Sequence, residues 1–161
     1  MITVRLIALG NLKEQYLRDA VSEYAKRLKG FCNFELIQLK EAYLPDAPSQ
    51  NEINAALESE GDRILALLSP KAYKIAMCVE GTQLSSEDFA AKIEWITVNT
   101  SSSEIVFIIG SSHGICDRVK RACDFRMSVS KLTLPHQLMR VVMLEAVYRA
   151  FNIIKGTKYH K

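Results

Sequence analysis

One short stretch, Glu104–Ile109, constrains the fold of this chain more than any other segment. It reads Glu-Ile-Val-Phe-Ile-Ile and does not alternate between polar and apolar residues. A strand without such alternation is usually covered on both faces, as in the parallel sheet of an α/β protein. The stretch therefore predicts an α/β fold built on a mostly parallel sheet.

Strand-like and helix-like segments alternate along the chain, which supports this prediction. Strands are predicted at Met1–Leu9, Cys32–Leu39, Ile75–Val79, Glu104–Ile109 and Phe125–Val129. Helices are predicted from Leu12 to Gly30, from a capping box at Ser49–Glu52 toward Leu68, after a cap at Ser85–Asp88, over Cys116–Cys123 and over Pro135–Lys155. No repeat or linker interrupts the pattern, so we expect a single domain over residues 1–161 with helices flanking the sheet.

Charge is distributed unevenly along the chain. The whole sequence carries a formal charge of +3. The segment from Phe125 to Lys161 holds seven Lys and Arg residues and one Glu, which gives 7 − 1 = +6 and leaves −3 for the first 124 residues. A basic block suits a polyanionic partner, because neutralising phosphates releases condensed counterions. Charge alone does not separate a nucleic-acid binder from a protein with a basic tail.

Hydropathy and cysteine spacing exclude several classes of protein. No apolar run approaches the roughly 20 residues that a bilayer requires, so we expect a cytoplasmic protein with no membrane partner. The four cysteines, Cys32, Cys78, Cys116 and Cys123, form no C-x-x-C pair. We therefore expect no metal site and interpret the thiols as small hydrophobic side chains in a reducing compartment.

Two segments that follow predicted strands are candidates for ligand binding, because open α/β sheets bind ligands at the carboxyl ends of their strands. The first, Ile109–Gly114, matches neither the dinucleotide fingerprint nor the phosphate loop, which disfavours a nucleotide-dependent oxidoreductase. The second is Ser128–Arg140. A helix start explains Thr133 and Pro135 in it, but not the concentration of Lys131, His136, Gln137 and Arg140 within ten residues.

Taken together, these motifs resemble the ribosomal large-subunit RNA methyltransferase H family, whose members are small proteins of the SPOUT class. The matching segments are Leu12–Glu14, Gly81–Ser86, Phe107–Gly110, Ser128–Arg140, Tyr148–Ala150 and the terminal Gly156–Lys161. The match spans the whole chain, and its Thr-x-Pro-His-Gln-x-x-Arg-Val core is highly specific. Several positions depart from the family pattern: Cys78 replaces a usual acid, Ser111 replaces a second glycine, Ala146 replaces a common glutamine, and the tail reads Thr157-Lys158 before Tyr159.

The resemblance implies a fold, a reaction and a set of partners. The reaction is S-adenosylmethionine-dependent methylation of N3 of a pseudouridine in large-subunit ribosomal RNA, on assembled ribosomes and without a metal. The fold ends in a C-terminal trefoil knot, which periodicity does not predict. The protein is expected to be a homodimer whose active sites are completed near the subunit interface. The implied cofactor contacts are Met77, Gly110, Val129, Ser130, Lys131, Leu132, Thr133 and Leu134.

The chemistry of the implied target suggests catalytic residues. The N3 imide must lose its proton, so the site needs a proton acceptor and a cation that stabilises charge on the flanking carbonyl oxygens. We assign the cation to Arg140 and the base to His160, with Tyr159 stacking on the target base or donating its hydroxyl. His136 is the alternative base. A noncatalytic RNA-binding or ribosome-associated module of the same fold is the alternative function.

Overall fold

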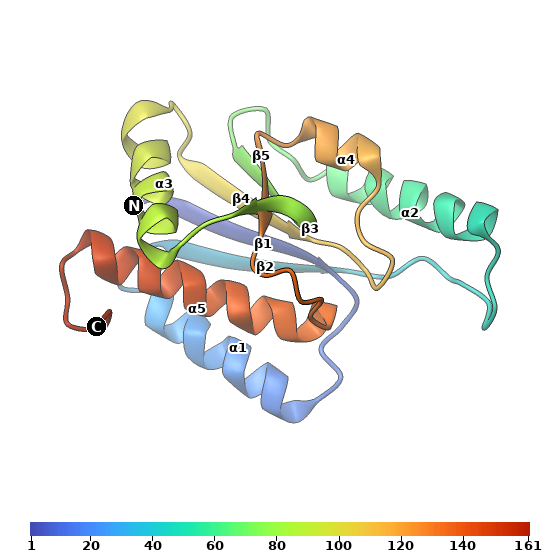
Figure 1. The fold of residues 1–161 in the computed structure, drawn as a ribbon, viewed down its shortest axis with the longest axis horizontal. Helices are drawn as coiled ribbons and strands as arrows, with labels where there is room; N and C mark the ends of the chain where they lie inside the picture. Colours follow the sequence, from blue (N-terminus) through green and yellow to red (C-terminus); the bar gives the residue numbers. More distant parts are fainter.

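The computed structural model describes residues 1–161 and contains five strands and five helices that alternate along the chain (Figure 1). The strands are β1 Thr3–Leu9, β2 Asn33–Leu39, β3 Tyr73–Gln83, β4 Glu104–Ile109 and β5 Phe125–Ser128. The helices are α1 Gln15–Leu28, α2 Gln50–Leu65, α3 Ser86–Asn99, α4 Asp117–Ala122 and α5 His136–Ile154.

The five strands form one sheet in the order β2-β1-β4-β3-β5, and every neighbouring pair is parallel. This confirms the predicted α/β fold, with a sheet that is entirely parallel. The carboxyl ends of all five strands therefore lie along one edge of the sheet, which is the edge where such sheets bind ligands. The trefoil knot stays a prediction from the resemblance.

Strand β4 lies in the middle of the sheet and contributes to two cores. Ile105, Phe107 and Ile109 pack with residues of α1, α3 and α5 on one face. Val106 and Ile108 pack with residues of α2 and α4 on the other face. All five side chains are buried. Coverage on both faces explains why this strand shows no polar alternation.

The predicted caps of two helices are confirmed. Ser49 Oγ accepts the Glu52 amide at 3.2 Å, and the Glu52 carboxylate accepts the Ser49 amide at 3.4 Å, which completes the capping box of α2. Ser85 Oγ accepts the amide of Asp88 at 3.0 Å at the start of α3. These contacts fix where the helices begin relative to the strands that precede them.

Several element boundaries differ from the prediction. Helix α1 begins at Gln15 rather than Leu12, because Leu12 is buried within the connecting loop and only mimics the helical apolar pattern. Helix α2 ends at Leu65 rather than near Leu68. Apolar periodicity records burial, and a loop residue can be buried without being helical.

Strand β3 extends beyond the predicted end at Val79. Met77 and Thr82 both pair with Met127 of β5, so the strand has a register shift and residues 78–81 bulge out of the ladder. A Cβ at Gly81 would approach the Met127 backbone to 2.6 Å, so only glycine fits there. Gly81, which lies beyond the predicted end of the strand, is part of this bulge.

All four cysteines are free. Cys32 and Cys116 are buried, as expected for small hydrophobic side chains, whereas Cys78 and Cys123 are only partly buried, which differs from that expectation. No helix in the structure combines the length and the apolar character that crossing a membrane would need.

Candidate active site

A cavity of about 450 Å³ opens at the carboxyl ends of β3, β4 and β5. Its walls come from residues 77–80 at the bulge of β3, the Gly110–Ile115 turn after β4 and the loop from Ser128 to His136 after β5. Volumes of this order are typical of small-molecule sites. Both segments that the sequence marked as ligand-binding candidates therefore meet at one site.

Seven of the eight predicted cofactor residues line this cavity: Met77, Gly110, Val129, Ser130, Leu132, Thr133 and Leu134. Lys131 is exposed and is not part of the lining. Apolar side chains such as Met77 and Leu134 share the walls with the hydroxyls of Ser130 and Thr133. This combination suits a ligand that has a flat apolar ring and a few polar groups.

Gly110 is required by the geometry of the turn. A Cβ at this position would lie 2.2 Å from the carbonyl oxygen of Gly114. The turn is closed by the Gly114 amide, which donates to the Ser111 carbonyl oxygen at 2.9 Å, and Gly114 itself has φ of +93°. Two glycines thus allow the chain to fold back tightly and form one wall of the cavity.

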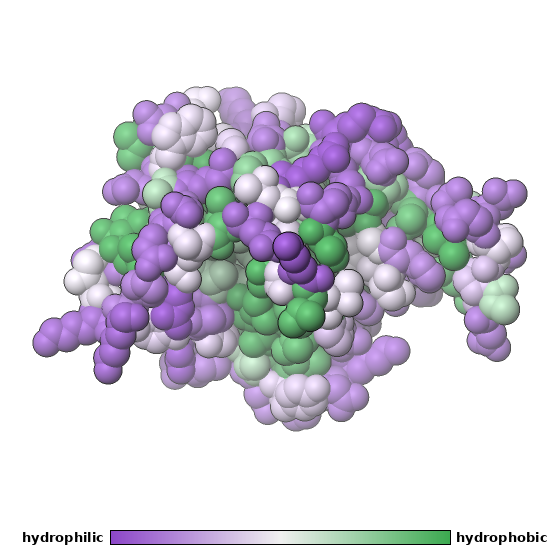
Figure 2. Space-filling model, viewed as in Figure 1, coloured by the Kyte–Doolittle hydropathy of each residue, from purple (hydrophilic) through white to green (hydrophobic).

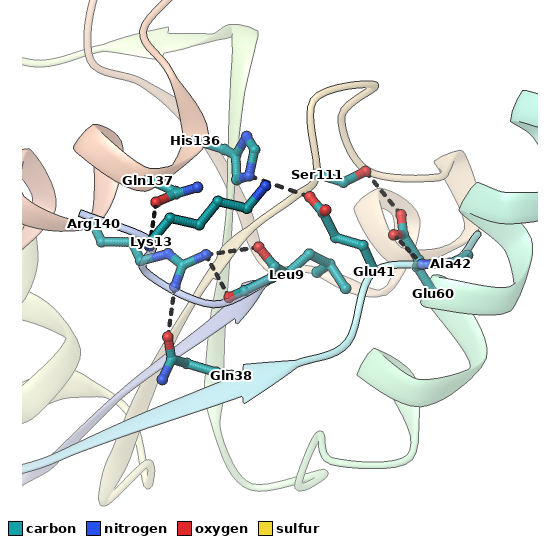
Figure 3. A network of polar contacts seen from close by, with 11 residues as sticks. Leu9, Lys13, Gln38, Glu41, Ala42, Glu60, Ser111, His136, Gln137 and Arg140 are labelled. Atoms are coloured by element: carbon teal, nitrogen blue, oxygen red, sulfur yellow. Dashed lines mark hydrogen bonds and ion pairs between the residues drawn. The ribbon is translucent and has the colours of Figure 1, made fainter. Parts of the chain in front are cut away.

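His136 is the first residue of α5 and lines the cavity. Its Nε2 lies 3.2 Å from a carboxylate oxygen of Glu41, in the loop after β2 (Figure 3). A carboxylate at Nε2 favours the tautomer protonated there and leaves Nδ1 free to accept a proton. The pair therefore has the arrangement of an oriented base.

Arg140 lies one turn further along α5 and is fully buried. Its Nη2 donates to the carbonyl oxygens of Leu9 at 2.7 Å and Gly10 at 2.8 Å, and its Nη1 donates to Gln38 Oε1 at 2.9 Å (Figure 3). Burial lowers the pKa of the guanidinium, and the nearby Glu41 partly opposes this shift.

These contacts place the guanidinium of Arg140 away from the cavity, and its role as the catalytic cation stays a prediction. The residue does not line the cavity, and its guanidinium binds the ends of β1 and β2 instead of facing a ligand. Backbone carbonyls at strand ends need donors when they are buried, and the guanidinium supplies them. In this subunit the guanidinium joins α5 to the ends of β1 and β2.

The C-terminal tail is ordered against α5 and α3. Tyr159 donates its hydroxyl to Glu145 at 2.8 Å, and Arg149 donates to the same carboxylate. His160 places Nε2 2.8 Å from a carboxylate oxygen of Glu87. Burial raises the pKa of Tyr159, and the hydrogen bond to Glu145 adds to this shift.

The tail does not reach the cavity of its own subunit. Neither Tyr159 nor His160 is among the lining residues, and His160 lies 3.5 Å from Arg149, near the other end of α5 from His136. Thirteen residues separate His136 from Arg149, which corresponds to about 20 Å along the helix. The two predicted bases therefore occupy separate places in one subunit.

Sequence reasoning missed two acidic residues beside the site. Glu60 of α2 is 4% exposed, and its carboxylate accepts hydrogen bonds from the Ala42 amide at 3.0 Å and the Ser111 hydroxyl at 2.9 Å (Figure 3). Glu41 contacts His136 as described above. Glu60 stands between Glu58 and Asp62 in a polar helix, so the sequence offers no signal that it is buried.

Cys78, which stands where the resembling family has an acid, also lines the cavity. Burial raises the pKa of its thiol, and the neighbouring carboxylate of Glu80 adds to this shift. Glu80 forms an ion pair with Lys120 at the same cavity. The thiol is therefore protonated at neutral pH and contributes no charge to the site.

Comparisons with known proteins point to one family. The chain matches the family model described as "Predicted SPOUT methyltransferase" over residues 2–160. It is 48% identical over 158 residues to a protein of Streptococcus thermophilus, with 98% of this chain and 99% of the relative covered. Relatives from Clostridium acetobutylicum and Leuconostoc mesenteroides are 43% and 42% identical, each with 99% of this chain and 100% of the relative covered. All three relatives are named ribosomal RNA large subunit methyltransferase H.

Proposed function

Because the chain belongs to the SPOUT methyltransferase family, we propose that it methylates N3 of a pseudouridine in large-subunit (23S) ribosomal RNA, using S-adenosylmethionine. The names of its relatives support the ribosomal RNA substrate. Assembled ribosomes are the proposed form of that substrate, which places the reaction in the cytoplasm. The proposal requires a cofactor site, a proton acceptor and a surface for RNA.

The observation that carries the proposal is the convergence of the cofactor residues. Met77, Gly110 and the loop after β5 are far apart in the sequence, yet they line one cavity of about 450 Å³. Met77 and Leu134 supply apolar walls for an adenine ring, and the Gly110 turn and Ser130 offer backbone and hydroxyl groups to its polar edge. These residues fit S-adenosylmethionine, which when bound supplies an electrophilic methyl group on a sulfonium.

His136 is our proposed proton acceptor in the subunit's own cavity. The imide proton of the target must pass to a neutral nitrogen within hydrogen-bond reach. His136 lines the cavity, and Glu41 holds Nε2 so that Nδ1 is available. Glu41 also stabilises the imidazolium that forms when Nδ1 takes up the proton. The structure thus supports the base that the sequence analysis ranked as the alternative.

Tyr159 and His160 take part in the reaction only where the tail of a second copy reaches this cavity. We propose such a homodimer. Figure 2 shows apolar side chains gathered over the half of α5 that lies nearest its start. Leu138, in this half, is 38% exposed, and Leu132, in the preceding loop, is 75% exposed. An exposed apolar face of this kind is typical of an interface between subunits.

Light scattering at micromolar concentration is expected to give twice the mass of the chain, and a monomer mass would overturn the dimer.

Calorimetry tests the cofactor and the alternative function together. A methyltransferase should bind both S-adenosylmethionine and its demethylated product, S-adenosylhomocysteine. A noncatalytic RNA-binding or ribosome-associated module of the same fold should bind ribosomes but neither of these ligands. Saturable heat with both ligands is the expected result. Its absence, in protein that still sediments with ribosomes, would favour the noncatalytic module.

A further inference from the structure

The buried carboxylate of Glu60 belongs to no part of the proposed reaction. It is 4% exposed, and both of its oxygens accept hydrogen bonds, from Ala42 N–H at 3.0 Å and from Ser111 O–H at 2.9 Å. None of the ion pairs in the structure involves Glu60. A buried carboxylate without a cation is costly unless its hydrogen bonds are complete, so these two contacts are a feature that needs explaining.

Ser111 belongs to the turn that forms one wall of the cofactor cavity. A second cavity of about 320 Å³ lies on the other side of the same turn, and Ser111, Ser112 and His113 line both cavities. The turn therefore lies between the two cavities. Its attachment to the rest of the molecule depends on polar contacts such as the Ser111–Glu60 hydrogen bond.

The contacts of Glu60 continue to the opposite wall of the cofactor cavity. Ala42, the other partner of Glu60, is adjacent in sequence to Glu41, whose carboxylate contacts His136 at 3.2 Å. Figure 3 shows this chain of contacts from Ser111 through Glu60 and the Glu41–Ala42 pair to His136. The loop after β2 thus joins the Gly110–Ile115 turn to the loop that ends at His136.

We propose that Glu60 is a positioning residue that sets the width of the cofactor cavity by tying Ser111 to the loop after β2. This inference rests on the proposed function, because the cavity must be the cofactor site. When the hydrogen bond between Ser111 and Glu60 is present, the backbone groups of the turn are held where they contact the ligand. When this hydrogen bond is lost, the turn moves toward the second cavity. Ligand binding must then restore the position of the turn, which makes the free energy of binding less favourable.

Substitution of Ser111 tests the role of its hydrogen bond to Glu60 directly. Ser111→Ala removes the hydroxyl and is expected to weaken S-adenosylhomocysteine binding about tenfold, as for a lost hydrogen bond to a charged group. Ser22→Ala makes the same change on the exposed surface of α1 and is the matched control. Calorimetry gives Kd, and a thermal melt of the same samples gives Tm. A purely structural role would lower Tm and leave Kd unchanged, which would overturn the proposal.

Substitutions of Glu60 separate its hydrogen bonds from its charge. In Glu60→Gln the amide oxygen can still accept from Ala42 while the amide nitrogen donates to Ser111, so Kd should stay within about twofold of the original value. Glu60→Ala loses both contacts and should weaken binding about as much as Ser111→Ala. Where Glu60→Ala fails to fold, Ser111→Ala and Glu60→Gln decide the question.

The double variant Glu60→Ala/Ser111→Ala completes the cycle. Because both residues act through one contact, its Kd should match that of Glu60→Ala alone, whereas losses that multiply would overturn the proposal. Failure of this inference differs from failure of the proposed function. If the unaltered protein binds S-adenosylhomocysteine and Ser111→Ala binds it equally well, only the positioning role of Glu60 is wrong. If the unaltered protein binds no such ligand, the proposed function itself fails.

Discussion

Arg140 donates a hydrogen bond of 2.7 Å from its buried guanidinium to the carbonyl oxygen of Leu9, the last residue of β1. The same guanidinium reaches Gly10 and Gln38, so α5 is tied to the ends of two neighbouring strands. His136 stands one helical turn before Arg140. The position of the proposed base therefore depends on a residue that lies outside the cavity.

Replacing Arg140 should lower the free energy of unfolding of the protein. Arg140→Ala leaves two backbone carbonyls and the Gln38 side chain without their donor in a buried site, and we expect a loss of at least about 3 kcal/mol of unfolding free energy. Urea denaturation measures this loss. The exposed side chain of Arg126, which forms no hydrogen bond or ion pair in the structure, gives the control: Arg126→Ala should stay within about 0.5 kcal/mol. Equal stability of the two variants would contradict the positioning role.

The thiol of Cys78 reports on ligand binding. Burial raises its pKa, so alkylation needs alkaline solution. Because Cys78 lines the cavity, S-adenosylhomocysteine at ten times its Kd should slow its alkylation at pH 9 roughly tenfold. Cys123, whose pKa burial raises to about 11, lies outside the cavity and should react at the same rate with or without the ligand. Peptide mass spectrometry distinguishes the two thiols, and an unprotected Cys78 would place the ligand elsewhere.

The sequence predicted the α/β fold and most of the residues that line the cavity, but it did not predict the contacts of individual polar residues. The apolar run of β4 predicted burial on both faces, and the two capping serines located the starts of α2 and α3. These features are local, so a single segment contains the information. The bulge of β3 was missed, because it depends on the pairing of that strand with β5.

The polar residues differ because their surroundings come from distant parts of the chain. Arg140 and His136 lie in one motif, yet the first is buried by strand ends more than 100 residues away and the second faces the cavity. Glu60 looks like a surface acid until the loop after β2 and the Ser111 turn close over it. Long-range contacts of this kind leave no periodic pattern in the sequence.

Glu145 should make stability depend on pH at the acidic end. Burial opposes its ionisation, but hydrogen bonds from Tyr24, Tyr159 and Arg149 outweigh burial and lower its pKa. A lowered pKa in the folded state stabilises the protein above the unfolded value of about 4.3, and this stabilisation is lost as the pH falls through the folded pKa.

Comparison of Glu145→Gln with the unaltered protein measures this contribution. The variant should be less stable by about 1 kcal/mol at pH 7, and the difference should shrink as the pH is lowered toward 3. Glu94 is exposed and without a side-chain partner, so Glu94→Gln should show a small difference that does not change with pH. Urea denaturation at several pH values checks both variants. A Glu145→Gln difference that stays constant from pH 7 to pH 3 would contradict the assignment.

Mixed dimers test whether the tail acts on the cavity of a second copy. One subunit carries His160→Ala, and the other carries Gly110→Ala, whose Cβ would clash with the Gly114 carbonyl and displace the turn that lines the cavity. Each variant alone should be nearly inactive. In an equal mixture half of the dimers are mixed and each has one intact site, so about a quarter of full activity should return. No recovery would mean that the tail does not act on the cavity of a second copy, and full activity of His160→Ala would mean that His160 takes no part in the reaction.

Transfer of labelled methyl from S-adenosylmethionine to ribosomes that lack the modification tests the central claim most directly. After the reaction, the large-subunit ribosomal RNA is digested to nucleosides and analysed by mass spectrometry. We predict about one methyl group per large subunit, recovered as a pseudouridine methylated at N3, and near-complete loss of transfer in Gly110→Ala, whose clash with Gly114 displaces the turn that lines the cavity. Label in another nucleoside would contradict the proposed target. No label in any RNA, with protein that binds S-adenosylhomocysteine and ribosomes, would contradict the proposed reaction.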